Sequence, residues 1–179
     1  MTLLSRGLMV LATTAWVATP AKSQESSSER AYFRAVAGFF QVPESEIAIL
    51  SHGGDIPSEE IPVVLFMARR GGVSAEAVAA LRESGRGWPE LAERFGVGAN
   101  VLHVPVRDPA SAGMLSAAYQ RFASTPMDRW SMVTLDGREI VALVNVRVLA
   151  QALGIEPDVV ASRSGSTASF VELYALFLR

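Results

Sequence analysis

The chain contains no cysteine and has one lysine and two histidines among its 179 residues. Without cysteine there is no disulfide, no thiolate metal site, no cysteine nucleophile and no lipid anchor on a lipobox cysteine. The histidines, His52 and His103, have no H-x-x-H, H-E-x-x-H or D-x-D-x-D-G spacing around them. The sequence therefore predicts no metal site and no cofactor.

Positive charge is also scarce, because 16 Lys and Arg residues stand against 18 Asp and Glu, and the net charge is -2 at pH 7. This is the wrong sign for a surface that neutralises phosphates, so nucleic acid is not expected as a partner. Hydrophobic residues make up 50% of the chain and charged residues 19%. Such a composition excludes a disordered chain and predicts a packed core, with one domain as the default at this length.

The first 23 residues have the layout of a secretory signal peptide. Arg6 precedes an apolar run over Gly7–Ala18, and a polar stretch follows. The run is shorter than the roughly 20 residues that a spanning helix needs, so cleavage is favoured over a retained anchor. Cleavage is expected after Ser23, with Ala21 as the alternative. We therefore expect a periplasmic or secreted protein, with no stable membrane insertion after signal cleavage, in which residues 24–179 form a single domain.

Residues 24–179 are expected to fold as short helices, so the predicted fold class is all-α. Apolar residues recur at intervals of three and four, and Gly or Pro separates the runs. Three helices begin with capping-box spacing, at Ser26 to Glu29, Asp136 to Glu139 and Ser169 to Glu172. The expected helices lie within 26–42, 43–50, 57–71, 74–84, 88–96, 109–122, 140–153, 157–163 and 169–178.

Two stretches depart from this pattern, and one helix stands out. Val97–Val106 contains Gly, Asn and Pro with alternating apolar residues, which favours an extended linker or an isolated strand. Thr125–Leu135 is expected to be a loop in which Trp130 plugs the core. Ile140–Leu153 is apolar on nearly every side, which predicts the central buried helix.

A shift of 82 residues aligns the chain with itself, placing Gly72 on Gly154 and Trp88 on Phe170. The match suggests repeat units at about 58–97 and 139–179, and a poorer match occurs at a shift of 31. Any helical domain that is rich in Gly stops also aligns with itself somewhere. If the repeat is real, each unit buries its apolar face against its neighbours in a compact helical array.

The segment Gly85–Val97 reads GRGWPELAERFGV. Its pattern, G-x-x-W-x-E-[IL]-A followed by x-[RK]-[FY]-G-[VI], resembles exported bacterial proteins made of short helices, over about Ala31–Val106. The resemblance implies export and a helical fold but no activity, because none is assigned to these proteins. The string also resembles the start of helix-turn-helix DNA-binding units. Residues 98–105 contain Gly and Pro but no Arg or Lys, so they make a poor recognition helix.

No set of reactive side chains is arranged for catalysis, so the chain is not expected to be an enzyme. His52 is expected to be a solvated turn residue. His103 is expected to be partly buried and bonded to backbone, with a pocket-lining role as the alternative. The Gly pairs follow helices, whereas a phosphate loop follows a strand. Ser162–Ser169 has no G-x-S-x-G elbow.

Two polar residues interrupt the predicted central helix, namely Asn145 and Arg147. An unpaired amide in a core costs a few kcal/mol and an unpaired guanidinium more, so each needs a partner or the surface. We expect them to form a network that fixes the fold, with a ligand-binding arginine as the alternative. The expected partner of Arg147 is a carboxylate such as Asp128, Asp136 or Glu172.

Four residues are therefore candidates for contact with a ligand or partner: His103, Trp130, Arg147 and Trp88. The two tryptophans are expected in the core, with exposed anchors as the alternative. The favoured function is a non-catalytic protein-interaction module with an unknown protein partner in the cell envelope. The first alternative is a cell-envelope enzyme, such as a hydrolase, or a small-ligand binder with a pocket near His103, Trp130 and Arg147. The second is a helix-turn-helix-like nucleic-acid binder.

Overall fold

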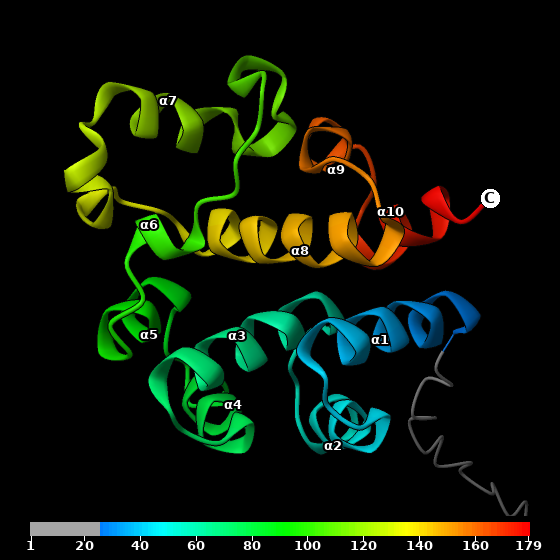
Figure 1. The fold of residues 1–179 in the computed structure, drawn as a ribbon. Helices are drawn as coiled ribbons and strands as arrows, with labels where there is room; N and C mark the ends of the chain where they lie inside the picture. The colour runs from blue at the N-terminus through cyan, green and yellow to red at the C-terminus, as the bar shows by residue number, and fades with distance from the viewer. Residues whose placement is uncertain (1–25) are drawn as a thin grey trace, which may run out of the picture.

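The structure is a computed structural model, and it describes residues 26–179. Within these residues every regular element is a helix and no strand occurs, so the predicted all-α fold class is confirmed (Figure 1). The predicted signal peptide, residues 1–23, lies outside the described residues. No helix in residues 26–179 combines the length and the apolar character that crossing a membrane requires.

The α-helices are α1 (Ser27–Phe40), α2 (Glu44–Gly53), α3 (Ile61–Gly71), α4 (Ala75–Glu83), α5 (Trp88–Arg94), α6 (Ala99–Leu102), α7 (Ser116–Ser124), α8 (Gly137–Leu153), α9 (Pro157–Arg163) and α10 (Phe170–Phe177). Short 3₁₀ helices lie between them: η1 (Ser58–Glu60), η2 (Pro109–Ser111), η3 (Gly113–Leu115) and η4 (Met127–Met132).

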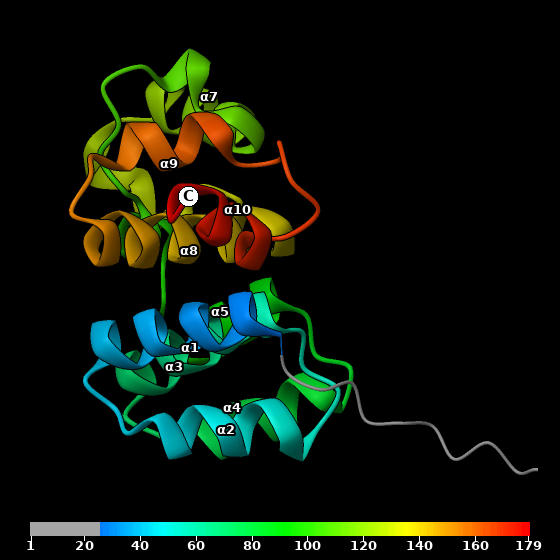
Figure 2. The same cartoon turned by 90° about the vertical axis from the view of Figure 1, so that its right-hand side faces the viewer.

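The helices stack in layers, which are seen edge-on in Figure 2. In that view α8 and α10 lie above α1 and α3, while α7 and α9 cover the upper side and α2 and α4 the lower side. Contacts of α8 with α1, α3, α9 and α10 tie the upper and lower halves together. The middle of the stack is therefore where buried polar groups of α8 meet the N-terminal half of the chain.

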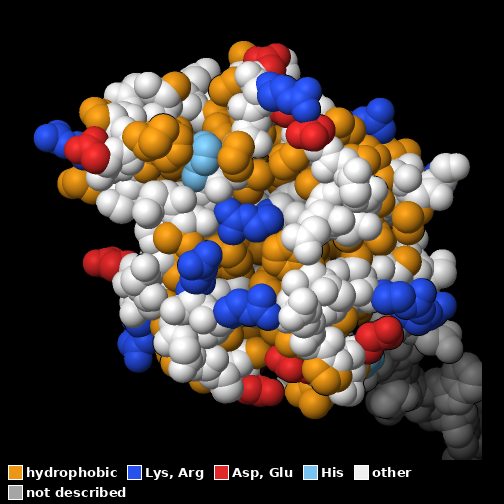
Figure 3. Space-filling model, in the orientation of Figure 1, with side chains coloured by type: hydrophobic (Ala, Val, Ile, Leu, Met, Phe, Trp, Pro, Cys, Tyr) orange, Lys and Arg blue, Asp and Glu red, His pale blue; other side chains and the backbone are white. Residues whose placement is uncertain are grey.

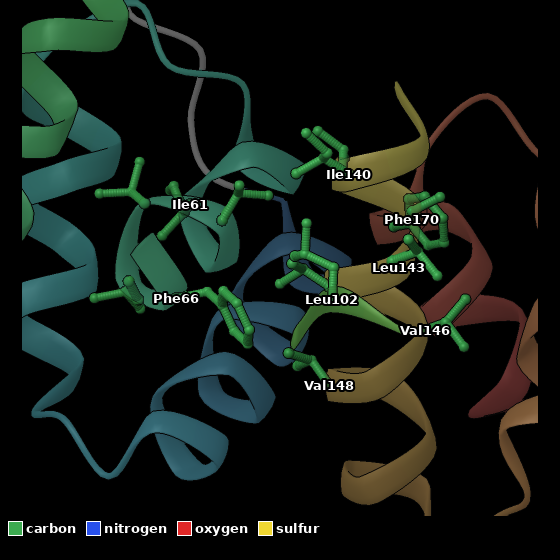
Figure 4. Packing of buried hydrophobic residues seen from close by; sticks show 14 of the residues in the cluster. Ile61, Phe66, Leu102, Ile140, Leu143, Val146, Val148 and Phe170 are labelled. Carbon is green, nitrogen blue, oxygen red and sulfur yellow. The ribbon is translucent and has the colours of Figure 1, made fainter. Parts of the chain in front are cut away.

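The helix α8 is the central buried helix that the sequence predicts. Asp136 and Glu139 form a complete capping box at its start, and Gly154 ends it with a left-handed φ of 65°. Its apolar residues are buried on both sides of the helix. In Figure 4, Phe66 of α3, Leu102 of α6 and Val148 of α8 lie together between these helices. This junction positions the surface described below.

One type of corner joins four pairs of helices, α1–α2, α3–α4, α5–α6 and α8–α9. The first helix ends at a residue with left-handed φ, and the N–H of the next, apolar residue donates to an alanine carbonyl five positions back. The pairs of donor and acceptor residues are Val42 and Ala37, Val73 and Ala68, Val97 and Ala92, and Ile155 and Ala150. Shared corner chemistry is enough to align the chain with itself at shifts of 82 and 31. The repeat itself stays a prediction.

The two irregular stretches contain more helix than the sequence suggests. Val97–Val106 includes the single turn α6, because the corner after α5 starts a new helix that ends before Pro105. Of the two alternatives for this stretch, the isolated strand is wrong, and residues 103–106 after α6 have no regular secondary structure. The predicted helix over 109–122 is divided into η2, η3 and α7, since Gly113 has a left-handed φ of 57°. The predicted loop Thr125–Leu135 contains η4, which carries Trp130.

Candidate functional site

The first polar residue of α8, Asn145, is fully buried in a closed hydrogen-bond network. Its Nδ2 donates to the carbonyl oxygens of Glu59 and Val141, both at 2.8 Å, and its Oδ1 accepts from the hydroxyl of Tyr32. Burial, and then the charge of Glu59, raise the pKa of Tyr32 well above its ordinary value, so this hydroxyl remains a donor. All the hydrogen-bonding groups of the amide are used. The network that the sequence predicts is therefore present at Asn145.

The second polar residue, Arg147, lies two positions on and is partly buried. Its Nη2 donates to the carbonyl oxygens of Val101, Leu102 and His103, at 3.0, 3.2 and 2.9 Å. These carbonyls belong to the C-terminal end of α6, where backbone acceptors have no partner within the helix and where positive charge is favourable. Arg147 therefore holds α6 and the chain that follows it against α8.

The expected ion pair of Arg147 with Asp128, Asp136 or Glu172 is wrong. Within residues 26–179, no carboxylate oxygen lies within 4.0 Å of a nitrogen of Arg147. The Asp136 and Glu172 carboxylates accept hydrogen bonds from backbone N–H groups near the starts of their own helices instead. The capping positions of these residues explain why they do not reach Arg147.

The guanidinium groups of Arg147 and Arg70 both lie close to the ring of Phe66. The Cζ of Arg147 is 5.2 Å from the centre of the Phe66 ring, and the Cζ of Arg70 is 5.6 Å from it. Both distances are within the range of cation–π contacts. Burial, and then the positive charge of Arg70, lower the pKa of Arg147. The protein thus holds two like charges near one apolar ring.

A third arginine lies next to this pair at the end of α3. Arg69 donates from Nη2 to the carbonyl oxygen of Phe40, and its Cζ lies 5.5 Å from the centre of the Phe40 ring. We call Arg69, Arg70 and Arg147 the basic row. Figure 3 shows blue side chains crossing the middle of this face, over α8 and α3, without an acidic side chain among them.

Four aromatic rings pack together at the upper end of the basic row. The His103 ring is 4.4 Å from Trp130, 4.8 Å from Phe122 and 5.6 Å from Tyr119 between ring centres. We call these residues the aromatic cluster. Trp130 Nε1 donates to the carbonyl oxygens of Phe122, at 3.1 Å, and Thr125, at 3.0 Å. The cluster is thus anchored to backbone at the end of α7.

The environment of His103 keeps its imidazole neutral at pH 7. Burial, and then the positive charge of Arg147, lower its pKa from the ordinary value. The charge of Arg147 acts at short range, because this arginine bonds the carbonyl of His103 itself. The basic row and the aromatic cluster are therefore contiguous, and with Phe66 they form what we call the basic–aromatic face. Figure 3 shows a histidine among hydrophobic side chains on the same face as the arginines.

Three of the four candidates from the sequence, His103, Trp130 and Arg147, thus meet on this face. The fourth, Trp88, does not. Its side chain is 2% exposed at the start of α5, and the Arg82 guanidinium lies 5.5 Å from its ring centre. The expected core position of Trp88 is confirmed, and the alternative of an exposed anchor is wrong, because packing at the start of α5 encloses the side chain. His52 is exposed and bonds to the carbonyl of Ala48, at 2.7 Å from Nδ1.

The sequence reasoning missed Phe66 and Arg70. Both fall within the predicted helix 57–71, where Phe66 looks like another core residue. The doublet of Arg69 and Arg70 was a usable indication, because two arginines at the end of an apolar helix have no acidic residue within one helical turn. Their closeness to Arg147 was not readable, because the two helices are far apart in the chain.

One of the larger cavities borders the basic row at Arg69, and two others are lined by none of its residues. One of about 580 Å³ is bounded by α5, α6 and the chain before α8, another of about 580 Å³ by α2, α3 and α4, and one of about 450 Å³ by α1, α8 and α10. None of these three is lined by His103, Trp130 or Arg147. The His103 ring packs against Trp130, and Arg147 binds backbone carbonyls. Over residues 26–179, no group of three or more His, Asp or Glu residues is placed to hold a metal ion.

Comparisons with protein families, with characterised proteins and with solved structures find no match to the chain. The resemblance to exported helical proteins therefore stays a prediction, and the function is argued from the geometry alone.

Proposed function

We propose that the protein is an exported, non-catalytic helical module that binds another protein through the basic–aromatic face. The observation that carries this proposal is that Trp130, His103, Arg70 and Arg147 gather at one surface. Tryptophan and arginine are enriched at protein interfaces and supply most of the residues that dominate binding energy. A partly exposed tryptophan beside arginines that have no carboxylate partner is thus the composition of a binding site.

The two methionines of η4 add to this surface. Met127 and Met132 are 73% and 78% exposed, and they flank Trp130 in the same short helix. Methionine is flexible and polarisable, and it is often used where an apolar surface must adapt to a partner. Exposed apolar residues at the margin of the face therefore support the same proposal.

Export is proposed from the sequence of residues 1–23, and it places the partner in the cell envelope or outside the cell. Fractionation followed by mass spectrometry of the new N-terminus tests this part. The expected terminus is Gln24. An intact Met1 in the cytoplasmic fraction would contradict it.

Photo-crosslinking in the living cell tests the interaction itself. A photoreactive amino acid replaces Met132 at the margin of the face. The matched control replaces Leu178, which is also apolar and is 55% exposed next to the C-terminus, at the opposite end of the molecule from η4 (Figure 1). We expect a discrete heavier adduct from position 132 and none from position 178. Equal labelling at both positions, or no adduct at position 132, would contradict the proposal.

The small-ligand or enzyme alternative is supported by one observation. His103, Trp130 and Arg147 do lie together, and the pKa values of His103 and Arg147 are both lowered. We favour protein binding because none of the three cavities described above is lined by His103, Trp130 or Arg147, whereas small-molecule sites are concave. The nucleic-acid alternative is not favoured, because the second helix of the α5–α6 unit is only Ala99–Leu102, with no basic side chain.

A further inference from the structure

We propose that the basic row binds the carboxylate groups of an acidic segment of the partner protein. This inference rests on the proposed function and names the chemistry of the partner. The row consists of Arg69, Arg70 and Arg147, with Phe66 beneath two of them. An acidic peptide would lie along this row.

The arginines of the basic row have no negatively charged partner among residues 26–179. Among residues 26–179, none of the three arginines has a carboxylate oxygen within 4.0 Å, whereas five other arginines do: Arg34, Arg82, Arg86, Arg107 and Arg121. Arg82, for example, pairs with Glu60 at 2.8 Å. Clustered like charges without a counter-ion are unfavourable. An anion that binds between them relieves this repulsion.

The Arg147 guanidinium is already held in place by the fold. Arg147 uses Nη2 to bind three backbone carbonyls, and its guanidinium is near the Phe66 ring, so its position is fixed before any ligand arrives. Within residues 26–179, the structure gives no hydrogen bond from the other guanidinium nitrogens of Arg147 or from the side-chain nitrogens of Arg70. Fixed guanidinium donors match the two oxygens of a carboxylate. Ligand binding therefore costs less side-chain conformational entropy.

The charge of the whole chain and the neighbours of the basic row indicate which anion fits the row. The chain as a whole is acidic, with a net charge of -2, so the basic row is a local exception and not part of a broad basic surface. A nucleic-acid site needs many phosphate contacts spread along a backbone. A short row of arginines beside exposed methionines and an aromatic cluster suits a peptide that carries both acidic and apolar residues.

Binding of a defined probe tests the proposal. The probe is a fluorescein-labelled peptide of alternating Glu and Leu, about 12 residues long, measured by fluorescence anisotropy at about 0.1 M NaCl. The test variant is Arg70→Met. The matched control is Arg163→Met, because Arg163 is also exposed near a helix C-terminus, with its Cζ 5.2 Å from the centre of the Phe177 ring. We expect Arg70→Met to weaken binding about tenfold and Arg163→Met to leave it unchanged.

Three results would overturn the proposal. The first is equally tight binding of the same peptide with Gln in place of Glu. The second is an equal weakening of binding by Arg70→Met and Arg163→Met. The third is no binding of the Glu peptide to the wild type. Inorganic tripolyphosphate serves as a competitor. If it binds the wild type more tightly than the Glu peptide, with the same dependence on Arg70, the site is a phosphate site and the carboxylate assignment is wrong.

The failure of this inference differs from failure of the proposed function. Crosslinking at Met132 without any effect of Arg70 on peptide binding would leave the interaction in place and remove the acidic partner. Peptide binding that depends on Arg70, without a crosslink in the cell, would leave the anion site in place and remove the envelope partner.

Discussion

Asn145 and Arg147 are polar residues on the same buried helix, two positions apart, and the structure treats them in opposite ways. Asn145 is fully buried, and each of its hydrogen-bonding groups has a partner inside the protein. Arg147 is partly buried, binds backbone carbonyls through one nitrogen, and lies near another arginine and no carboxylate. One polar site is closed, and the other is open.

The difference separates a structural role from a binding role. A closed network stabilises the fold and has no capacity left for a ligand. A cluster of arginines without carboxylate partners stabilises the fold less than arginines that are paired with carboxylates. A binding function is therefore the better explanation for the cluster. The predictions below test this division, starting with the closed site.

The largest expected effect follows from breaking the closed network. Asn145→Leu leaves the buried Tyr32 hydroxyl and the partly buried Glu59 carbonyl without this partner, and we expect the free energy of unfolding to fall by about 3 kcal/mol. Urea unfolding measures it. Tyr32→Phe removes one of the stranded groups, so the double variant should lose less than the two single losses added together. Strict additivity of the losses would contradict a network.

A smaller loss is expected at the open site. Arg147→Met removes the donor to the three carbonyls at the end of α6, but these lie near the surface and water can replace part of the interaction. We expect a loss of about 1–2 kcal/mol in the free energy of unfolding. Arg147→Lys keeps a charge and a donor and should lose less. If Arg147→Met costs as much as Asn145→Leu, the site is not open.

The smallest effect is a dependence on pH that arises at His103. The pKa of His103 is lowered in the folded protein. At pH values below the ordinary histidine pKa of about 6.5, the unfolded chain therefore binds a proton at this residue more readily than the folded protein does. The free energy of unfolding should therefore fall as the pH is lowered from about 6.5 towards the folded-state pKa. His103→Gln removes this contribution, so the variant should lose less stability than the wild type between these pH values. Equal losses in urea titrations at each pH would contradict the burial of a neutral imidazole.

Most of the fold could be predicted from local sequence. The capping pair Asp136 and Glu139 and the stop at Gly154 set the bounds of the central helix. The path from Val97 to Val106 could not be predicted, because the carbonyls at the end of α6 are bound by Arg147, which is distant in the sequence. Local propensity favours an extended chain there, and a tertiary contact overrides it.

The candidate site was accessible from the sequence only in part. His103, Trp130 and Arg147 stand out because each is polar or aromatic in unusual surroundings. The partner of Arg147 was predicted wrongly, because counting nearby acidic residues does not show which of them already cap helices. Phe66 gives no indication at all in the sequence, since its role depends on the packing of α3 against α8.

The most direct test of the open site is the free energy of unfolding of Arg70→Glu compared with Arg163→Glu. Both variants place an acidic residue in the last turn of a helix and remove a cation–π contact, which together cost about 1 kcal/mol. At position 70 the new carboxylate also gains the neighbouring charge of Arg147, so we expect Arg70→Glu to remain within about 0.5 kcal/mol of the wild type while Arg163→Glu loses the full amount. Equal losses in the two variants would show that Arg70 and Arg147 do not repel each other, and the account of an open, ligand-ready site would be wrong.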